Sequence, residues 1–226
     1  MLLAIDTATR WASLALYDEA GIAAEYSWRC SAQHTRQVLP AIDHMLRATQ
    51  TSVSDISALA VAQGPGSFTG LRIGLSIAKG LSLARDLPIV AIPTLDITAY
   101  AAGDPGCPLI AVLEMRRGRI VTAQYRFEEG EPVVEGEVVI RQAGTWQPPT
   151  DEPILVTGEI SSELARRLLQ LPGGEQIAVA SQATTVRRAG FLAELAWLRL
   201  ERGEPPAADE LAPIYLQQPA AGAPEG

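Results

Sequence analysis

The sequence predicts an α/β protein built from two lobes of similar design. Strand-like apolar runs alternate with segments of helical period, and three strands followed by alternating helix and strand occur roughly twice. A stretch rich in glycine and proline at 103–108 separates the two runs. We therefore expect a first lobe at 1–102, a smaller second lobe at 103–216 and a disordered tail at 217–226. The last helix could instead fold back onto the first lobe and make this boundary discontinuous.

Each element follows from the local pattern of side chains. Strands are expected where apolar and β-branched residues lie between turn residues, and helices where apolar residues recur at spacings of three and four. The first lobe then has strands at 2–9 (including a polar turn), 12–17, 23–28, 58–62 and 89–92, and helices at 38–46, 69–85 and 94–102. The second lobe has strands at 109–114, 120–125, 138–140, 154–157 and 176–179, and helices at 161–170 and 191–200. Ser161 or Ser162 is expected to cap the first helix of the second lobe.

The charge balance bears on the class of partner. The chain has 226 residues, a net charge of −8 and a single lysine, Lys79. Because proteins that bind nucleic acid directly usually carry a basic face, this balance argues against tight tRNA binding by the chain itself. Arg116, Arg117 and Arg119 are expected on a turn between strands, with tRNA contact as the alternative. Apolar runs stay below the ~20 residues that span a bilayer, and the start of the chain lacks a basic leader, so we expect a cytoplasmic protein.

Two polar turns could together form a phosphate site. One follows the first strand, and the other is the glycine-rich turn 64–70 ahead of the long helix. Carboxylates and hydroxyls can meet a phosphate or its magnesium ion, and a helix N-terminus offers free N–H groups to an anion. The candidate ligands are Asp6, Thr7, Thr9, Gly64, Gly66 and Ser67. The alternative is a tight turn in which Ser67 or Thr69 caps the helix and the polar side chains satisfy turn backbone.

The helix at 69–85 predicts an interface. Apolar residues surround it, so it must be covered all round. Gly70, Gly74 and Ala78 form a line of small residues four apart, along which another helix could approach closely. We expect a second chain to cover this side, and the alternative is the chain's own second lobe.

Groups suited to independent catalysis are scarce. His34 and His44 are the only histidines, and their spacing of ten rules out an i, i+4 metal pair. No Ser-His-Asp set or Cys-His pair is suggested. We therefore expect neither a catalytic residue nor a metal ligand in this chain.

Several segments together resemble the TsaB family, formerly called YeaZ. The block Gly64-Pro65-Gly66-Ser67-Phe68-Thr69-Gly70 is the most specific of them, and the resemblance runs from residue 1 to about 216. The segments that carry it are residues 3–9, 34–40, 64–74, 113–117 with Tyr125, and 213–216. The resemblance implies an actin-like ATPase (ASKHA, RNase H-like) fold with two lobes, the second reduced.

The resemblance also implies a role and partners. TsaB-like proteins are non-catalytic subunits that work in making threonylcarbamoyladenosine on tRNA, paired with TsaD, a paralogue that transfers the threonylcarbamoyl group, and joined by the small ATPase TsaE. The isolated chain is expected to be a homodimer that reaches tRNA only indirectly and has no membrane partner. The interface implied on the first-lobe helices comprises His34, Thr35, Val38, Ile42, Thr69, Gly70, Leu71, Ile73, Gly74, Ile77, Ala78 and Leu81.

The sequence departs from the catalytic paralogue and from actin-like kinases. The metal-binding histidines of TsaD-like proteins would fall near Thr94 and Thr98, and threonine is a poor ligand for a transition metal. Ala8 stands where such kinases usually have glycine, and Glu114 stands where relatives commonly have aspartate. We expect no tightly bound cofactor, with ATP or ADP in the assembled complex left open. The alternative function is a small phosphotransferase or ATPase of the same fold acting alone, and a metallopeptidase is the least favoured.

Overall fold

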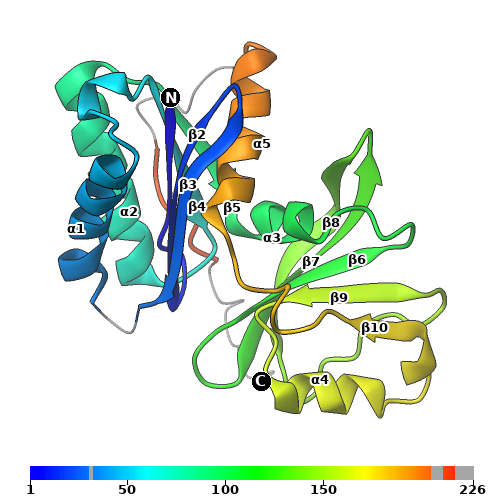
Figure 1. Ribbon diagram of the computed structural model, residues 1–226. Coiled ribbons are helices and arrows are strands. Elements are labelled where there is room, and N and C mark those ends of the chain that lie inside the picture. The colour runs from blue at the N-terminus through cyan, green and yellow to red at the C-terminus, as the bar shows by residue number, and fades with distance from the viewer. Residues whose placement is uncertain (31–32, 205–210, 217–226) are drawn as a thin grey trace, which may run out of the picture.

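The computed structural model describes residues 1–30, 33–204 and 211–216. Within these residues the strands form two five-stranded sheets, each with helices packed on both faces (Figure 1). The tail that the sequence predicts to be disordered, 217–226, lies outside the described residues. No helix of the described part of the chain is long and apolar enough to cross a membrane.

The first sheet has the strand order β3-β2-β1-β4-β5. Strands β1 (Leu2–Asp6), β2 (Trp11–Asp18) and β3 (Gly21–Arg29) form an antiparallel meander, and β4 (Ala58–Gly64) and β5 (Ile89–Pro93) continue the sheet parallel to β1. Strand β1 is buried over its whole length, because both faces of this sheet are covered.

Alternating side chains of β1 serve two separate cores. Leu3 and Ile5 face helices α1 (His34–Ala48) and α2 (Phe68–Arg85), whereas Leu2 and Ala4 belong to the cluster on the opposite face. In Figure 1, α1 and α2 cover one side of the first sheet and α5 covers the other. The period-two pattern of the strand therefore distributes its apolar residues between two helix layers.

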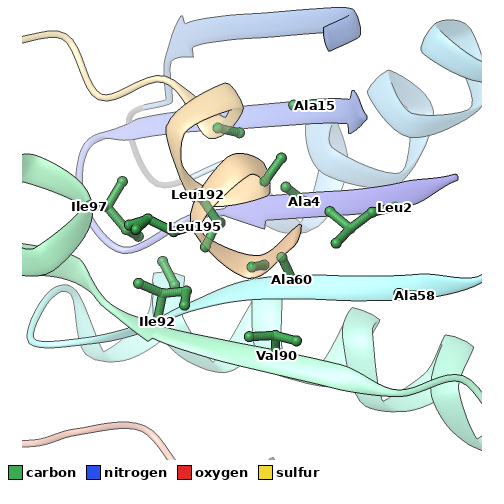
Figure 2. Close-up of a cluster of buried hydrophobic side chains, with 14 of the residues drawn as sticks. Leu2, Ala4, Ala15, Ala58, Ala60, Val90, Ile92, Ile97, Leu192 and Leu195 are labelled. Atoms are coloured by element: carbon green, nitrogen blue, oxygen red, sulfur yellow. The ribbon is translucent and has the colours of Figure 1, made fainter. Parts of the chain in front are cut away.

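Helix α5 (Ala189–Glu201) packs on the first sheet although it follows the second-lobe strands in sequence. Figure 2 shows Leu192 and Leu195 reaching from α5 toward the small side chains of Ala4 and Ala60. Alanines on the sheet let a helix approach closely and let its leucines fill the space between. The first lobe is consequently built from two separate stretches of the chain.

The second sheet repeats the connectivity of the first, with the order β10-β9-β6-β7-β8. Its antiparallel meander is β6 (Leu109–Glu114), β7 (Arg119–Glu128) and β8 (Glu131–Gln142). Strands β9 (Ile154–Gly158) and β10 (Ile177–Val179) then run parallel to β6. Two sheets with the same order of three antiparallel and two parallel strands define a duplicated fold.

Two helices flank the second sheet. Helix α4 (Ser162–Leu169) contributes to the core on one face, and α3 (Thr94–Ala102) packs on the other. Helix α3 also contacts β4 of the first sheet and α5, so it lies between the lobes. Two short 3₁₀ turns, Val53–Asp55 and Gly174–Gln176, complete the elements of the described part of the chain.

The predicted helices all form, and the expected cap of α4 is Ser161, whose hydroxyl accepts the backbone N–H of Leu164. The strand expected at 138–140 is wrong in its extent, because β8 runs from Glu131 to Gln142. Strand β8 is an edge strand with mostly exposed side chains, and its pairing with β7 shifts register between Thr122 and Gln124. An exposed, bulged edge strand lacks the apolar alternation by which strands are predicted.

Candidate functional site

The junction between the lobes is occupied by a buried ion cluster. Asp6 ends β1 of the first lobe, Glu159 follows β9 of the second lobe, and Arg187 precedes α5. The side chains of Asp6, Glu159 and Arg187 are 1%, 5% and 2% exposed. We call these three residues together with Thr9 the interlobe cluster. It joins segments that are far apart in the sequence.

The guanidinium of Arg187 is the centre of this cluster. Its Nε donates to Asp6 Oδ2 at 2.6 Å, and its terminal nitrogens donate to Asp6 Oδ1 at 3.3 Å and Glu159 Oε1 at 3.0 Å. A further bond runs to the hydroxyl oxygen of Thr9 at 3.0 Å, and that hydroxyl donates to Glu159 Oε1. The backbone N–H of Ala8 donates to Asp6 Oδ1 at 2.9 Å. The oxygens of both carboxylates thus converge on one cation.

Two carboxylates face a single guanidinium in this cluster. Burial acts to lower the pKa of Arg187, but the nearby charges of Asp6 and Glu159 outweigh it and raise the pKa, so the guanidinium stays charged. His34, buried at the start of α1, has its pKa lowered by burial against the opposing effects of the Thr9 backbone and Asp6. His34 is therefore neutral at neutral pH and supplies no second positive charge.

The glycine-rich turn packs against the turn that follows β1. A Cβ at Gly66 would overlap the carbonyl oxygen of Ala8, and one at Gly70 would overlap the carbonyl oxygen of Thr7. The Thr7 hydroxyl donates to Gly70 O at 2.7 Å, and a Cβ at Gly74 would overlap that same hydroxyl. These glycines are required because two backbone segments of this chain touch there.

The residues of the predicted phosphate site come together, but their polar groups are engaged with each other. Asp6 and Thr9 bind Arg187, Thr7 binds the start of α2, and the Ser67 hydroxyl accepts the N–H of Gly70 as the helix cap. The actin-like fold that the resemblance implies would hold a nucleotide with its metal between the lobes. The residues present do not fit that group, because a guanidinium and the packed glycine turn fill the position.

The remaining polar candidates lie in helix α3, beside the start of α4, or at the turn between β6 and β7. The Thr98 hydroxyl donates to Thr94 O at 2.9 Å within α3, and the buried Thr94 hydroxyl has no hydrogen-bond partner among the residues that the structure describes. Glu114 Oε1 accepts the N–H of Ser161 at 2.5 Å, which places a negative charge at the N-terminus of α4. Arg116 and Arg117 lie on the turn from β6 to β7, as the sequence predicts, whereas Arg119 is already the first residue of β7. In the described residues no group of three or more His, Cys, Asp or Glu side chains could hold a metal ion.

A groove of about 410 Å³ opens on the outer surface between α1 and α2. Its exposed apolar side chains include Leu39 of α1 and Phe68 of α2, which are 55% and 53% exposed. The Arg72 guanidinium lies over the Phe68 ring at 3.7 Å from its centroid and donates from Nε to the Tyr215 hydroxyl at 3.0 Å. The groove is lined by Thr35, Leu39, Phe68, Thr69, Arg72, Ile73, Ser76 and Ile77.

The structure corrects the predicted interface in detail. The line of Gly70, Gly74 and Ala78 faces inward, where Gly74 meets Thr7 and Ile5 of β1 and Ala78 lies in the core. No second chain is needed to cover this line, so that argument for an interface is wrong. The predicted interface residues that the structure buries are His34, Val38, Ile42, Gly70, Leu71, Gly74 and Ala78. Thr35, Thr69, Ile73, Ile77 and Leu81 remain at least partly accessible.

Sequence reasoning missed Glu159 and Arg187. No local motif surrounds either residue, and 150 residues of sequence separate Glu159 from Thr9. One signal was available. An aspartate ends a buried strand, and the chain has no phosphate-binding lysine motif beside which that aspartate could hold a metal and phosphate. A buried aspartate needs a cationic partner, but the sequence does not say which arginine supplies it.

The duplicated sheet order and the filled junction define a class. This is a two-lobed protein of the actin-like ATPase fold that holds its lobes together with its own side chains. A family model described as "TsaD: tRNA N6-adenosine threonylcarbamoyltransferase" matches residues 27–194.

Similar proteins specify the family. The chain is 33% identical over 225 residues to the tRNA threonylcarbamoyladenosine biosynthesis protein TsaB of Escherichia coli, covering 98% of this chain and 88% of that protein. It is 33% identical to the Bacillus subtilis protein of the same name, over 71% of this chain and 72% of that one. The solved structure of YeaZ from Pseudomonas aeruginosa superposes with a TM-score of 0.78 at 26% identity, covering 95% of this chain and 99% of that one. The chain belongs to the TsaB family.

Proposed function

We propose that this chain is a non-catalytic subunit in the biosynthesis of threonylcarbamoyladenosine on tRNA, pairing with a TsaD-like transferase through the α1–α2 groove. The observation that carries the proposal is the exposed apolar groove between α1 and α2 in a chain that belongs to the TsaB family. An open groove with half-exposed leucine and phenylalanine side chains is typical of a protein interface rather than of a free surface.

The match to the TsaD model supports a partner of related fold. Two proteins with the same helices on the same sheet can present equivalent faces to one another, as copies of one chain do in a symmetric pair. The same groove would hold a second copy when the chain is isolated, so a homodimer and the TsaD-like pair would compete for it. Arg72, stacked on Phe68 at the groove, fits the preference of interfaces for arginine and aromatic residues.

The interlobe cluster supports a non-catalytic role for this subunit. Its carboxylates are buried and bound to Arg187, so neither is free to act as a base or to hold a metal. The TsaD-like partner would then carry out the catalysis. A TsaE-like ATPase would be recruited to the pair, and the complex would work in the cytoplasm. Any ATP or ADP in the assembly would bind outside this chain's own interlobe junction. A net charge of −8 favours indirect contact with tRNA.

The test is a binding measurement between the purified chain and its TsaD-like partner. Leu39→Glu places a charge on the exposed α1 side of the groove, and we expect it to weaken binding by at least about tenfold, since interface centres exclude unpaired charge. Leu169→Glu is the matched control, because Leu169 is 53% exposed on α4 of the second lobe. Isothermal calorimetry reports affinity, and sedimentation reports the homodimer.

Equal affinities of the two variants would overturn the groove as the interface. The alternative, an ATPase or phosphotransferase acting alone, predicts turnover by the isolated chain that is lost in Asp6→Asn. We expect the isolated chain to show no such turnover.

A further inference from the structure

Arg187 gathers oxygens from both lobes around one cation: it forms a two-bond pair with Asp6 and single bonds to Glu159 and Thr9. Oxygens from Asp6, Glu159 and Thr9 all lie within 3.3 Å of its guanidinium nitrogens. Carboxylate and hydroxyl oxygens converging from separate segments are the donors that Mg²⁺, Mn²⁺ and Ca²⁺ prefer. All three side chains are buried, so no water layer separates these oxygens from the charge.

The charge balance of the interlobe cluster also favours a position suited to a divalent cation. Two carboxylates share one guanidinium, and the neighbouring His34 does not add a positive charge at neutral pH. A pair of carboxylates around one monovalent cation is one positive charge short of neutrality. A divalent ion placed among these oxygens would supply that missing charge, whereas removal of Arg187 without replacement would leave two carboxylates uncompensated.

We propose that Arg187 is a built-in cation that takes the place of a divalent metal between the lobes. Its side chain lies at the junction of the lobes, and it joins Asp6 of the first lobe to Glu159 of the second. The lobes are then held in one relative position without any ligand. This inference does not depend on the α1–α2 groove or on the identity of the partner.

The position of Arg187 in the chain strengthens its role as a connector. Arg187 lies two residues before Ala189, whose backbone N–H donates to the Ser13 hydroxyl at 2.8 Å at the start of α5. The segment that carries the cation therefore also anchors the helix that returns to the first sheet. Both attachments draw the same stretch of chain onto β1 and β2.

The test replaces the internal cation with an added one. In Arg187→Ala, Mn²⁺ alone is the probe, and we expect it to raise the melting temperature and to bind with a Kd of roughly 10⁻⁴–10⁻³ M, the range of weak oxygen-ligand sites. The wild-type protein should show no Mn²⁺-dependent shift, because the guanidinium occupies the position. Electron paramagnetic resonance of free Mn²⁺ measures binding independently of stability.

Two further variants keep the test decisive. Arg187→Ala/Glu159→Gln should lose the Mn²⁺ response, since one of the two carboxylates is gone. If Arg187→Ala does not fold without metal, Arg187→Ala/Asp6→Asn should recover folding, because it removes an uncompensated buried charge. Arg188→Ala is the matched control: Arg188 adjoins Arg187 in sequence, but its side chain is 50% exposed and pairs with Glu25 at the surface.

The outcomes separate the proposal from a simple structural ion pair. Mn²⁺ binding by Arg187→Ala, absent from wild type and from Arg188→Ala, supports a cation position. Absence of Mn²⁺ binding by a folded Arg187→Ala protein would overturn it, as would equal Mn²⁺ binding by wild type. Failure of Asp6→Asn to restore folding to an unfolded Arg187→Ala protein would likewise count against it.

Discussion

At the scale of single residues, the glycines of α2 divide into two kinds. Gly70 and Gly74 touch the turn after β1, whereas at Gly80, on the same helix, no atom of the described residues lies within 4 Å of the position of a Cβ. Identical residue types in one helix therefore have different reasons to be there. At Gly70 the reason is a close backbone contact, and at Gly80 nothing in the structure explains the choice.

Alanine substitution tests this difference. Gly70→Ala should lower the free energy of unfolding by about 1–3 kcal/mol, because its methyl group overlaps the Thr7 carbonyl oxygen. Gly80→Ala should raise it by about 0.5–1 kcal/mol, since an exposed helical glycine only adds entropy to the unfolded chain. Urea denaturation of both variants measures the two changes. Equal effects would contradict the packing of α2 on the β1 turn.

At the scale of elements, α5 is a structural part of the first lobe, although it lies near the end of the chain. It supplies the second layer of the first lobe, and its buried residues share a cluster with β1, β4 and β5. Without α5, the face of the first sheet formed by Leu2, Ala4 and Ala60 would be exposed to water. The helix is thus part of the first lobe in energetic terms as well as in position.

Truncation of one core side chain of α5 tests its contribution. Leu192→Ala should lower the free energy of unfolding by about 2–5 kcal/mol, because Leu192 is fully buried against the first sheet. Hydrogen exchange should then show lost protection in β1 in addition to α5. Leu198→Ala, at a partly exposed position of the same helix, is the control and should cost clearly less. Normal protection of β1 in Leu192→Ala would show that α5 is not a layer of this lobe.

At the scale of the whole molecule, the lobes are in contact at several places in the described residues. Helix α3 packs on strands of both sheets, α5 returns to the first sheet, and the interlobe cluster joins the ends of β1 and β9. Each connection requires both lobes to be folded. Two domains linked in this manner are expected to unfold together.

Calorimetry tests this coupling. We expect the wild-type chain to unfold in a single transition, with equal calorimetric and van't Hoff enthalpies, because neither lobe retains its full core without the other. A fragment of residues 1–102 lacks α5 and should not form a stable first lobe. Two resolved transitions, or a cooperatively folded 1–102 fragment, would contradict the coupling.

Prediction from sequence succeeded where the signal was local. Helical spacing located α1, and the glycine-rich turn located the start of α2. The cap of α4 was predicted as Ser161 or Ser162, and it is Ser161. It failed for β8, whose exposed edge position removes the apolar alternation. For the candidate site, the sequence correctly predicted that Asp6, the residues after it and the glycine turn lie together. It predicted that they bind a phosphate, whereas in the structure they bind Arg187 and each other.

The sequence also could not predict which face of α2 packs on the chain's own sheet and which face is accessible. The line of Gly70, Gly74 and Ala78 reads equally as a face for another chain or for the chain's own sheet. Only the position of Thr7 and Ile5 against Gly74 shows that the sheet covers it. The accessible face is instead the one that carries Phe68 and Arg72.

By itself, the sequence determined the α/β class, the duplicated order of elements and the family resemblance, because these depend on periodicity and on short contiguous motifs. The tertiary structure decided which layer α5 joins, which face of α2 is open, and that Arg187 lies between Asp6 and Glu159. The physical reason is that buried charges and close backbone contacts are satisfied by residues distant in sequence, whose pairing only the folded chain specifies.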